Sequence, residues 1–325
     1  MRHVVRWQDL VVGARVVVRH RHPDGSAGDA LGELVADDGE TLTVETRRGP
    51  VVVARSAVLA AKGVPPAPAR RAAPHRALDA EQLQRVTHEH WRSREQVPLG
   101  DWLLRAHDGF SSRANSALAV GDPGRPLAEA VAAVEAFYAQ RGLPPLMSVP
   151  GAVDEPTALT EHLAGAGWTP RAETLVMTAA RLDVEPLASP PPGFVVEREP
   201  RPSADWLSLY RGGVPEVGVE VLCSAADQVF VSVRETASPD VVAVGRGSLS
   251  PGWLGLSAVE VCDSYRRRGL ATLVLAELLR WGATRSATSV FLQVTTENTG
   301  ARAMWSRAGF EEHSRYHYRA APTDD

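Results

Sequence analysis

The sequence predicts an α/β protein with a mixed sheet, in which a tandem repeat of one fold follows a small all-β barrel. Three observations support this fold class. Residues 1–62 hold several short alternating segments separated by turn residues, which is typical of a small barrel. Residues 124–168 and 269–310 each run helix, strand, helix and close on Gly-Trp or Gly-Phe. This shared order and spacing predicts two copies of one domain.

Segments rich in proline predict where the chain divides. Residues 63–76 read GVPPAPARRAAPHR, a composition that forms no core and favours a semi-extended linker. A second proline run lies at 189–193. We therefore expect a barrel at 1–62, a linker at 63–76, a degenerate copy of the repeated domain at 77–188 and a complete copy at 189–325.

Composition excludes several classes of function. The chain has 325 residues, 44% of them hydrophobic, and a net charge of −4, which gives no general attraction to nucleic acid or to anionic membranes. Cys223 and Cys262 are the two cysteines and have no metal-ligand spacing, so no metal is expected. No apolar run is long enough for a membrane span and no signal peptide opens the chain, so we expect a cytoplasmic protein.

The predicted barrel is SH3-like in size. Its strands are expected at 14–19, 31–35, 41–46 and 51–54, with turns between them. Aromatic residues are not interleaved with the basic ones, and Trp7 lies alone near the edge, so nucleic-acid binding by stacking is not favoured. We expect this module to mediate a protein contact or to stabilise the chain.

The first copy of the repeat, 77–188, lacks a plausible phosphate loop. The turn at 121–126 reads GDPGRP, and Pro123 and Pro126 remove backbone N–H donors that a phosphate would need. Asp122 adds a negative charge. His88 and His90 diverge on a helix and have no third ligand in view, so a metal site is not expected there either.

The second copy contains the stretch that most constrains function. Residues 256–261 alternate like a strand, 263–268 form a short loop with three arginines, and an apolar helix opens at Gly269. A loop that leads free backbone N–H groups into a helix N-terminus can bind an anion. Taken alone, the loop fits a phosphate site and a solvated basic loop equally well.

The series R-x-x-G-x-A, strand, N-x-x-A-x-x-M-W-x-x-x-G-F, over roughly 194–319, resembles the GNAT superfamily of acetyl-CoA-dependent N-acetyltransferases. The resemblance implies that the loop backbone holds the coenzyme pyrophosphate, through Arg266, Arg267, Arg268, Gly269, Leu270 and Ala271. It also implies that the main chain of Val259 and Val261 bonds the pantetheine and that Asn298 contacts the coenzyme arm.

Acetyl transfer to an amine needs a neutral amine, a polarised thioester carbonyl and a proton for the departing thiolate. Glu260 is the ionisable residue on the expected coenzyme strand and could take the ammonium proton, or else face solvent or pair with an arginine. Many GNAT enzymes donate the proton from a tyrosine where this chain has Trp305, and indole cannot serve as that acid. Tyr316, on the last strand, is the substitute that we expect, although aromatic packing would also explain it.

The whole chain looks like an actinobacterial tandem-GNAT group whose members carry the names N-acetylglutamate synthase or histone-type acetyltransferase. The motifs F-x-x-R-x-N-S and H-x-x-Y-x-Y-R carry this resemblance. It implies a small amino acid acceptor such as glutamate, whose carboxylate Arg113 and Asn115 could hold. Arg113 could instead pair with an acid inside the first copy.

Three functions remain open from the sequence. The first is acetylation of a small-molecule amine by acetyl-CoA, the second is acetylation of a protein recruited by the barrel, and the third is non-catalytic sensing of acetyl-CoA.

Overall fold

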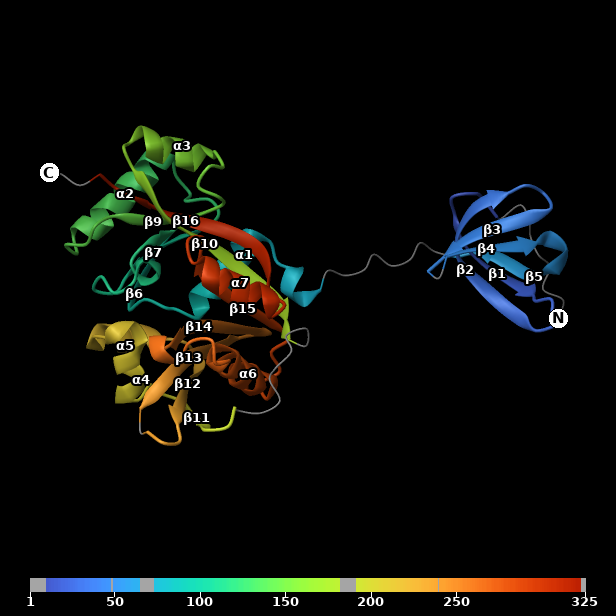
Figure 1. Cartoon of the computed structure of the whole chain (residues 1–325). Helices are drawn as coiled ribbons and strands as arrows, with labels where there is room; N and C mark the ends of the chain where they lie inside the picture. The colour runs from blue at the N-terminus through green and yellow to red at the C-terminus, as the bar shows by residue number, and fades with distance from the viewer. Residues whose placement is uncertain (1–9, 48, 65–72, 182–190, 239, 323–325) are drawn as a thin grey trace. The chain divides into compact units, whose positions relative to one another are not determined.

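The computed structural model describes residues 10–47, 49–64, 73–181, 191–238 and 240–322. The chain divides into two compact units, Met1–Arg71 and Ala72–Asp325, which we call unit 1 and unit 2 (Figure 1). The predicted linker at 63–76 and the predicted break at 189–193 lie partly outside the described residues.

Unit 1 is a five-stranded antiparallel sheet in the order β4-β3-β2-β1-β5. Its strands are β1 (Arg15–Arg21), β2 (Ala27–Asp37), β3 (Thr41–Thr46), β4 (Gly49–Ala54) and β5 (Val58–Gly63). Alternate residues of these strands, such as Val16, Val18 and Leu34, form its hydrophobic core.

A closed barrel, expected from the sequence, is not shown. The sheet is open among the described residues, with β4 and β5 as its two edges. The turn Arg55–Ala57 carries the chain from one edge to the other without pairing the two strands. Alternating patterns with turns predict such strands but do not determine whether a sheet closes, because closure depends on twist and stagger.

Unit 2 is built on one eleven-stranded mixed sheet in the order β11-β12-β13-β14-β15-β10-β16-β9-β8-β7-β6. Its strands are β6 (Glu95–Leu99), β7 (Trp102–Ala106), β8 (Ala117–Leu118), β9 (Leu146–Pro150), β10 (Thr169–Ala180), β11 (Phe194–Glu199), β12 (Asp227–Glu235), β13 (Val241–Ser250), β14 (Trp253–Val261), β15 (Ser289–Thr295) and β16 (Glu311–Ala320). Its α-helices are α1 (Ala80–Glu89), α2 (Leu127–Ala139), α3 (Ala158–Gly165), α4 (Ala204–Leu209), α5 (Glu216–Leu222), α6 (Leu270–Ala283) and α7 (Thr299–Arg307).

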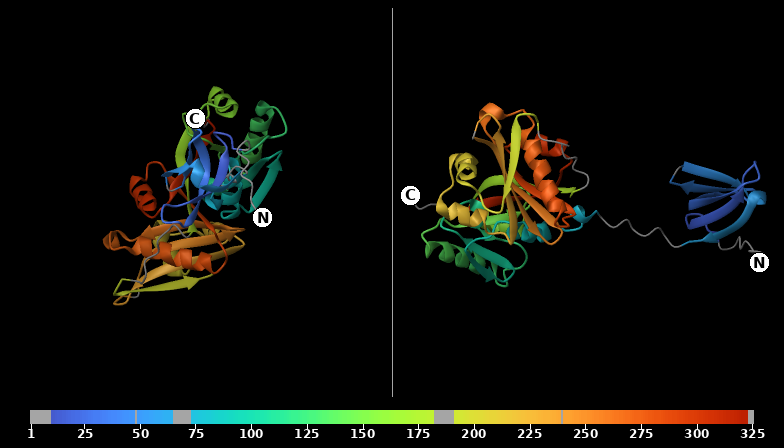
Figure 2. Two further views of the ribbon diagram at one scale, coloured as in Figure 1. Left: turned by 90° about the vertical axis from the view of Figure 1, so that its right-hand side faces the viewer. Right: turned by 90° about the horizontal axis from the view of Figure 1, so that it is seen from below.

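The two halves of unit 2 repeat one pattern of strand pairing. β6-β7-β8-β9 and β12-β13-β14-β15 each pair antiparallel, antiparallel and then parallel. Figure 2 shows α4 and α5 (yellow) on one side of the C-terminal strands and α6 (orange) on the other. This is the mixed α/β architecture that the sequence predicts.

The halves are joined by exchanged strands, which the sequence does not predict. β10 belongs by chain order to the first half but lies between β15 and β16 of the second. β16 in turn lies between β10 and β9, so that Tyr316 is opposite both Thr174 and Pro150. The central strands thus belong to both halves at once, and side chains from both can face one site.

Side-chain packing also joins the halves. Trp91, at the end of α1, and Ala114 lie in the same buried cluster as Trp206, Leu222 and neighbouring residues of the C-terminal half. A second cluster buries the apolar face of α6 against β12 to β15. In the described part of the chain, no helix is long and apolar enough to cross a membrane.

Candidate functional site

The strands β14 and β15 separate in the middle of the sheet. Their parallel pairing runs from Trp253 opposite Ser289 to Leu256 opposite Leu292. Just beyond, the register of β14 against β13 shifts, and Ala258 takes a positive φ of 53°. This bulge turns β14 away from β15. The described pairing of the two strands ends there, which leaves backbone groups of β14 available in the gap.

The predicted coenzyme strand has the expected alternation of side chains. Val259 and Val261 are half-buried and pack against the hydrophobic core beneath α6. Glu260 lies between them, and its carboxylate accepts the backbone N–H of Arg211 at 3.0 Å.

The loop before α6 leaves the start of that helix without a side-chain cap. Gly269 is the N-cap residue, with φ 80°, and a Cβ built on it meets nothing within 4 Å. Arg267 also has a positive φ, of 61°. Arg266 pairs with Asp263 at 2.6 Å, and Arg268 lies 4.8 Å from the centre of the Tyr265 ring. These features fit an anion, because the first N–H groups of a helix point outward and the space before them is open.

Three further residues of the predicted coenzyme site lie near helix starts. Leu270 is buried and Ala271 half-buried on the first turn of α6. Asn298 is the N-cap of α7, and its Oδ1 accepts the N–H of Ala301 at 3.0 Å. Its side chain is exposed.

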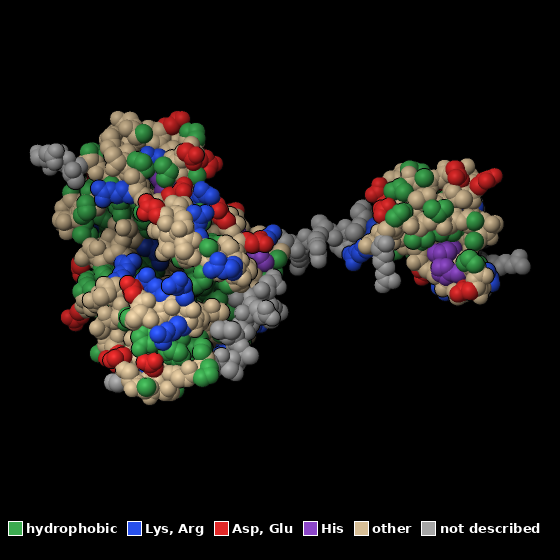
Figure 3. Space-filling view, viewed as in Figure 1, with side chains coloured by type: hydrophobic (Ala, Val, Ile, Leu, Met, Phe, Trp, Pro, Cys, Tyr) green, Lys and Arg blue, Asp and Glu red, His purple; other side chains and the backbone are tan. Residues whose placement is uncertain are grey.

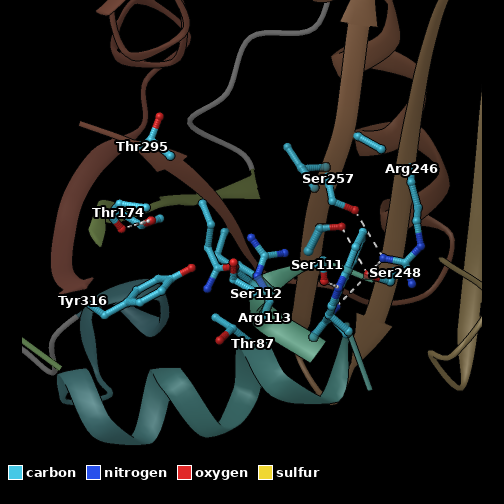
Figure 4. Close-up of a pocket in the computed structure, with 18 of the residues that line it drawn as sticks. Thr87, Ser111, Ser112, Arg113, Thr174, Arg246, Ser248, Ser257, Thr295 and Tyr316 are labelled. Atoms are coloured by element: carbon cyan, nitrogen blue, oxygen red, sulfur yellow. Dashed lines mark hydrogen bonds between the residues drawn. The ribbon is translucent and has the colours of Figure 1, made fainter. Parts of the chain in front are cut away.

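A pocket of about 400 Å³ lies where β14 and β15 separate (Figure 4). From the N-terminal half it is lined by the end of α1, by residues 111–113 and by β10. From the C-terminal half it is lined by residues 210–211 and by β13 to β16. Among the described residues that line it, Arg113, Arg211 and Arg246 are basic and none is Asp or Glu. In Figure 3, arginine side chains (blue) gather around a hollow on the displayed face of unit 2. The pocket is therefore suited to an anionic ligand.

Two of these arginines stack on one indole. The guanidinium carbons of Arg113 and Arg246 lie 5.2 Å and 5.5 Å from the Trp91 ring centre. The Trp91 Nε1–H donates to Ser111 at 3.0 Å, which fixes the ring. The Arg113 Nε is buried without a hydrogen-bond partner, and so is the Arg246 Nη2. Within the described residues, neither guanidinium forms an ion pair with a carboxylate.

Arg246 is a residue of the pocket lining that sequence reasoning missed. It is fully buried, and its Nε donates to the carbonyl of Leu222 at 2.6 Å. Its Nη1 donates to Ser248 and Ser257, both at 3.2 Å. Burial lowers its pKa to about 10, so the group remains protonated at neutral pH.

The sequence does contain a signal for this residue. Arg246 is a single charge in an apolar strand, between Gly245 and Gly247. A Cβ at Gly245 would lie 2.3 Å from Val274, so that glycine lets α6 approach β13 closely. The arginine then points to the other face of the sheet.

His90 and Trp91 were also missed as parts of the pocket. The His90 Nδ1 is 2.9 Å from Ser248 Oγ, and its Nε2 is 2.9 Å from Ser250 Oγ. Burial lowers the pKa of His90 to about 3, which keeps the imidazole neutral next to Arg246. The N-terminal half therefore supplies residues that hold β13 in place.

Tyr316 and Tyr318 point from β16 into the pocket. Tyr316 is 2% exposed, and its hydroxyl is directed toward the side on which Arg113 lies (Figure 4). Burial, more than any neighbouring group, raises the pKa of Tyr318. Trp305, by contrast, is buried in the core and packs against Phe310 with ring centres 5.6 Å apart.

Asn115 is not among the residues that line the pocket. Its Oδ1 accepts the N–H groups of His107 and Gly109, at 2.7 and 3.0 Å. Its Nδ2 donates to the carbonyls of Phe110 and Ser111, at 2.8 and 3.0 Å. Asn115 thus fixes the shape of the loop that carries Arg113, and a direct contact with a ligand stays a prediction.

The equivalent helix start in the N-terminal half is closed to an anion. The N–H of Asp122 donates to the Asp101 carboxylate at 3.0 Å, and that of Gly124 to the Asp122 carboxylate at 2.8 Å. Pro126 forms the N-cap of α2. Carboxylates therefore already accept the backbone N–H groups that a phosphate would need. Among the described residues, no group of three or more His, Cys, Asp or Glu could hold a metal ion.

Comparisons with known proteins agree with this architecture. The family model described as "Probable histone acetyltransferase Rv0428c C-terminal" matches residues 79–319. The chain is 31% identical, over 98% of its length and 97% of the relative, to the probable histone acetyltransferase Rv0428c of Mycobacterium tuberculosis. It is 28% identical to the uncharacterized N-acetyltransferase YobR of Bacillus subtilis, over 74% of this chain and 98% of the relative.

Solved structures show the fold. A GCN5-related N-acetyltransferase from Kribbella flavida has a TM-score of 0.58 at 19% identity, covering 75% of this chain and 96% of the other. A tandem GNAT protein from the clavulanic acid biosynthesis pathway has a TM-score of 0.50 at 15% identity, covering 65% and 76%. Together with the family match and the full-length relative, they show that the chain belongs to the Rv0428c-like family of GNAT-fold N-acetyltransferases and is an acetyltransferase.

Proposed function

We propose that this protein transfers the acetyl group of acetyl-CoA to the primary amine of a small α-amino acid. One observation carries the proposal. The pocket at the separation of β14 and β15 is lined by three arginines and, among the described residues, by no Asp or Glu. Such a pocket favours an acceptor that brings its own negative charge, and an amino acid carries that charge next to its amine.

The residues around the gap fit acetyl-CoA. The uncapped start of α6 and the open space at Gly269 suit a pyrophosphate, held by the main chain of 266–271. The free edge of β14 at Val259 and Val261 suits the amides of pantetheine. When bound, the coenzyme supplies an activated thioester carbonyl, which the acceptor amine attacks directly without an acyl-enzyme.

Arg113 is the residue that we assign to the acceptor carboxylate. Its Nε is buried without a partner, and its side chain is held above Trp91 at the pocket wall. A guanidinium can donate two parallel hydrogen bonds to a carboxylate. Glutamate, which the whole-chain resemblance suggests, is the first acceptor to test.

Tyr316 is the proton donor that we assign to the departing thiolate. It lines the pocket from β16, the strand shared by both halves. Trp305, at the position of the usual tyrosine, is buried in the hydrophobic core instead. Glu260 remains the candidate proton acceptor on β14, with its carboxylate bonded to the Arg211 N–H outside the pocket lining.

A second function is favoured by the names of the relatives. Rv0428c is called a probable histone acetyltransferase, so a protein amine is the alternative acceptor. Unit 1 would then recruit the protein. An arginine-lined pocket repels the neighbouring lysines and arginines of a histone tail, and we therefore place the amino acid first. A non-catalytic acetyl-CoA sensor is the third possibility.

A thiol-release screen of the purified full chain with acetyl-CoA tests these functions. The acceptors are the common amino acids, their decarboxylated amines and a set of Lys-containing peptides. We expect turnover with an amino acid and at least about 10-fold less with its decarboxylated amine, because a charge-assisted pair is lost. Preference for peptides or for amines without a carboxylate contradicts the proposal. Tight coenzyme binding without any turnover identifies a sensor.

A further inference from the structure

The pocket holds a buried positive charge that its surroundings do not compensate. Arg246 is fully buried, and within the described residues it has no carboxylate partner. Its Nη2 has no hydrogen-bond partner. A buried cation without a counter-ion is costly, and side chains of this kind are usually paired. Its position beside the pocket therefore indicates a use.

Arg246 cannot easily move away or lose its charge. Three hydrogen bonds, to Leu222, Ser248 and Ser257, fix the guanidinium, and the Trp91 ring covers it. Arginine stays protonated in proteins across the working pH range. The positive charge is thus a permanent feature of the pocket wall.

The titratable groups that face Arg246 do not neutralise it. From the N-terminal half, His90 is neutral because burial lowers its pKa to about 3, and Arg113 adds a second positive charge. From the C-terminal half, burial raises the pKa of the Cys223 thiol, and Tyr210 contributes a hydroxyl. The other ionisable residues of the lining are Arg211, Tyr316 and Tyr318.

Glu260 is the carboxylate residue of β14, the strand that lines the pocket beside β13. It accepts the Arg211 N–H and is not among the residues that line the pocket. A bound α-carboxylate would neutralise Arg113 but would leave Arg246 uncompensated. The acceptor amine would then lie in a cavity with a net positive wall.

We propose that the fixed charge of Arg246 expels the proton of the acceptor ammonium, so that the pocket itself performs the task otherwise given to a general base. This inference rests on the proposed function. The N–H bond of R–NH₃⁺ breaks, the proton leaves to solvent, and the nitrogen keeps the electron pair with which it attacks the thioester carbonyl. The ion pair between Arg113 and the carboxylate offsets the repulsion that the ammonium meets on entry.

The size of the effect follows from Coulomb's law. A full charge at about 10 Å, with an effective dielectric constant of about 20, corresponds to about one pKa unit. The pKa of a bound amine should fall by that amount. At pH 7 this raises the fraction of neutral amine roughly 10-fold.

The test is the pH dependence of kcat at saturating acetyl-CoA and saturating amino acid, which reports groups in the bound complex. In the wild type, we expect the acid limb of kcat about one pH unit or more below the pKa of the free amine. In Arg246→Gln, the limb should rise by about one unit, with roughly a 10-fold loss of kcat at pH 7 and little loss near pH 9.5.

Arg319→Gln is the matched control. Arg319 is also buried and donates to His317 and to the carbonyl of Val153, but it lies outside the pocket lining. Its replacement should lower stability and leave the acid limb unchanged. Glu260→Gln adds a second comparison, because loss of the acid limb in that variant would make Glu260 the base.

Several outcomes overturn the inference. A wild-type limb at or above the free-amine pKa contradicts it, and so does a loss of kcat in Arg246→Gln that is equal at all pH values. If Arg246→Gln does not fold, the wild type decides alone. Across several amino acids with different amine pKa values, its limb should follow the free-amine pKa and stay about one unit below it, whereas the limb of a general base would stay at one pH. Absence of turnover with every amine instead refutes the proposed function.

Discussion

Arg105 on β7 and Arg246 on β13 occupy equivalent positions in the two halves of unit 2. Each donates to the hydroxyl of the serine eleven residues further along the chain, Ser116 at 2.8 Å and Ser257 at 3.2 Å. In the C-terminal half the serine lies on the neighbouring strand β14, and in the N-terminal half it directly precedes the neighbouring strand β8. The halves thus preserve a buried Arg–Ser pair as well as the order of their elements.

The two arginines differ in what surrounds them. Arg246 lines the pocket, whereas Arg105 does not: its Nε donates to the Ser116 carbonyl, and Tyr316 and Tyr318 of β16 lie near its guanidinium. Tyr138 closes this region by donating to the Arg105 carbonyl at 2.9 Å. One half therefore presents its arginine to the pocket, and the other buries the equivalent residue among its own hydrogen bonds.

We predict that one chain binds one acetyl-CoA. In the N-terminal half, the carboxylates of Asp101 and Asp122 accept the N–H groups at the turn before α2, and Pro126 supplies none. Isothermal titration of the full chain with acetyl-CoA should give a stoichiometry near one. A clear value of two would show that both halves bind coenzyme.

Gly269→Asp should weaken acetyl-CoA binding by at least about 10-fold. The change places a carboxylate where the loop before α6 is open, and a negative charge there repels a pyrophosphate. Gly142→Asp is the control, because Gly142 also has a positive φ, 62°, and open space around it. Both variants should lose about 1 kcal/mol of stability through backbone strain. Equal coenzyme affinities by calorimetry would refute the assignment of 266–271.

Tyr316→Phe should lower kcat by roughly 100-fold or more, in the range expected for loss of a general acid. Acetyl-CoA affinity should change little, since the coenzyme loop lies on other elements. Tyr318→Phe, two residues along the same strand, is the comparison in steady-state kinetics. A larger loss in Tyr318→Phe would transfer the role to that residue, and unchanged kcat in both would leave the two tyrosines as packing.

The sequence predicts the elements of unit 2 better than their connections. The helix at α6, the strand β14 and the loop between them follow from local periodicity and from Gly269. The exchange of β10 and β16 does not, because alternation along a strand carries no information about which strand lies beside it. The open edge of unit 1 was missed for the same reason.

The sequence also predicts some residues of the candidate site and not others. Arg113 and Tyr316 were expected from motifs, and the structure places both at the pocket. Trp91 and Arg246 were not expected. Trp91 follows an ordinary helix pattern, and the glycines on either side of Arg246 mark its strand as unusual without showing that it lines a pocket. The pocket forms only where the two halves pack together. Motifs detect backbone requirements such as Gly269, whereas a site formed between repeats depends on tertiary contacts.

Acid should destabilise the protein before its carboxylates titrate. Burial lowers the pKa of His88 to about 4 and that of His90 to about 3, both below the ordinary value of 6.5. Between these values and pH 6.5, the unfolded chain therefore binds protons that the folded chain does not. The contribution of the two histidines to the free energy of unfolding is complete above about pH 6.5 and falls as the pH decreases. Each histidine should contribute a slope of up to about 1.4 kcal/mol per pH unit between pH 6 and 5.

Urea unfolding at pH 7, 6 and 5 measures that slope. His88 Nε2 lies 3.0 Å from the Gln96 side-chain oxygen, and a glutamine at 88 can make a similar contact. His88→Gln should therefore remove about half of the slope. A wild-type free energy of unfolding that is flat from pH 7 to 5 would show that the two histidines are accessible to protons.

The final prediction concerns Arg113 and the acceptor. Its Nε is buried and unpartnered, it stacks on Trp91, and Asn115 fixes its loop through four hydrogen bonds of 3.0 Å or less. A residue held in this way without an ion pair is preorganised for a carboxylate. Arg113→Ala should lower kcat/KM roughly 10- to 100-fold, which corresponds to the loss of about 1.5–3 kcal/mol from one charge-assisted pair.

Acceptor KM should carry most of that loss, because the carboxylate is bound equally in the ground state and in the transition state. Acetyl-CoA affinity should hardly change. Arg125→Ala, at an exposed turn of the same half, is the control and should leave both constants unaltered. If coenzyme affinity and stability also fall as KM rises, Arg113 is structural. With decarboxylated amines, wild type and Arg113→Ala should be equal, since the group that Arg113 binds is then absent from both reactions.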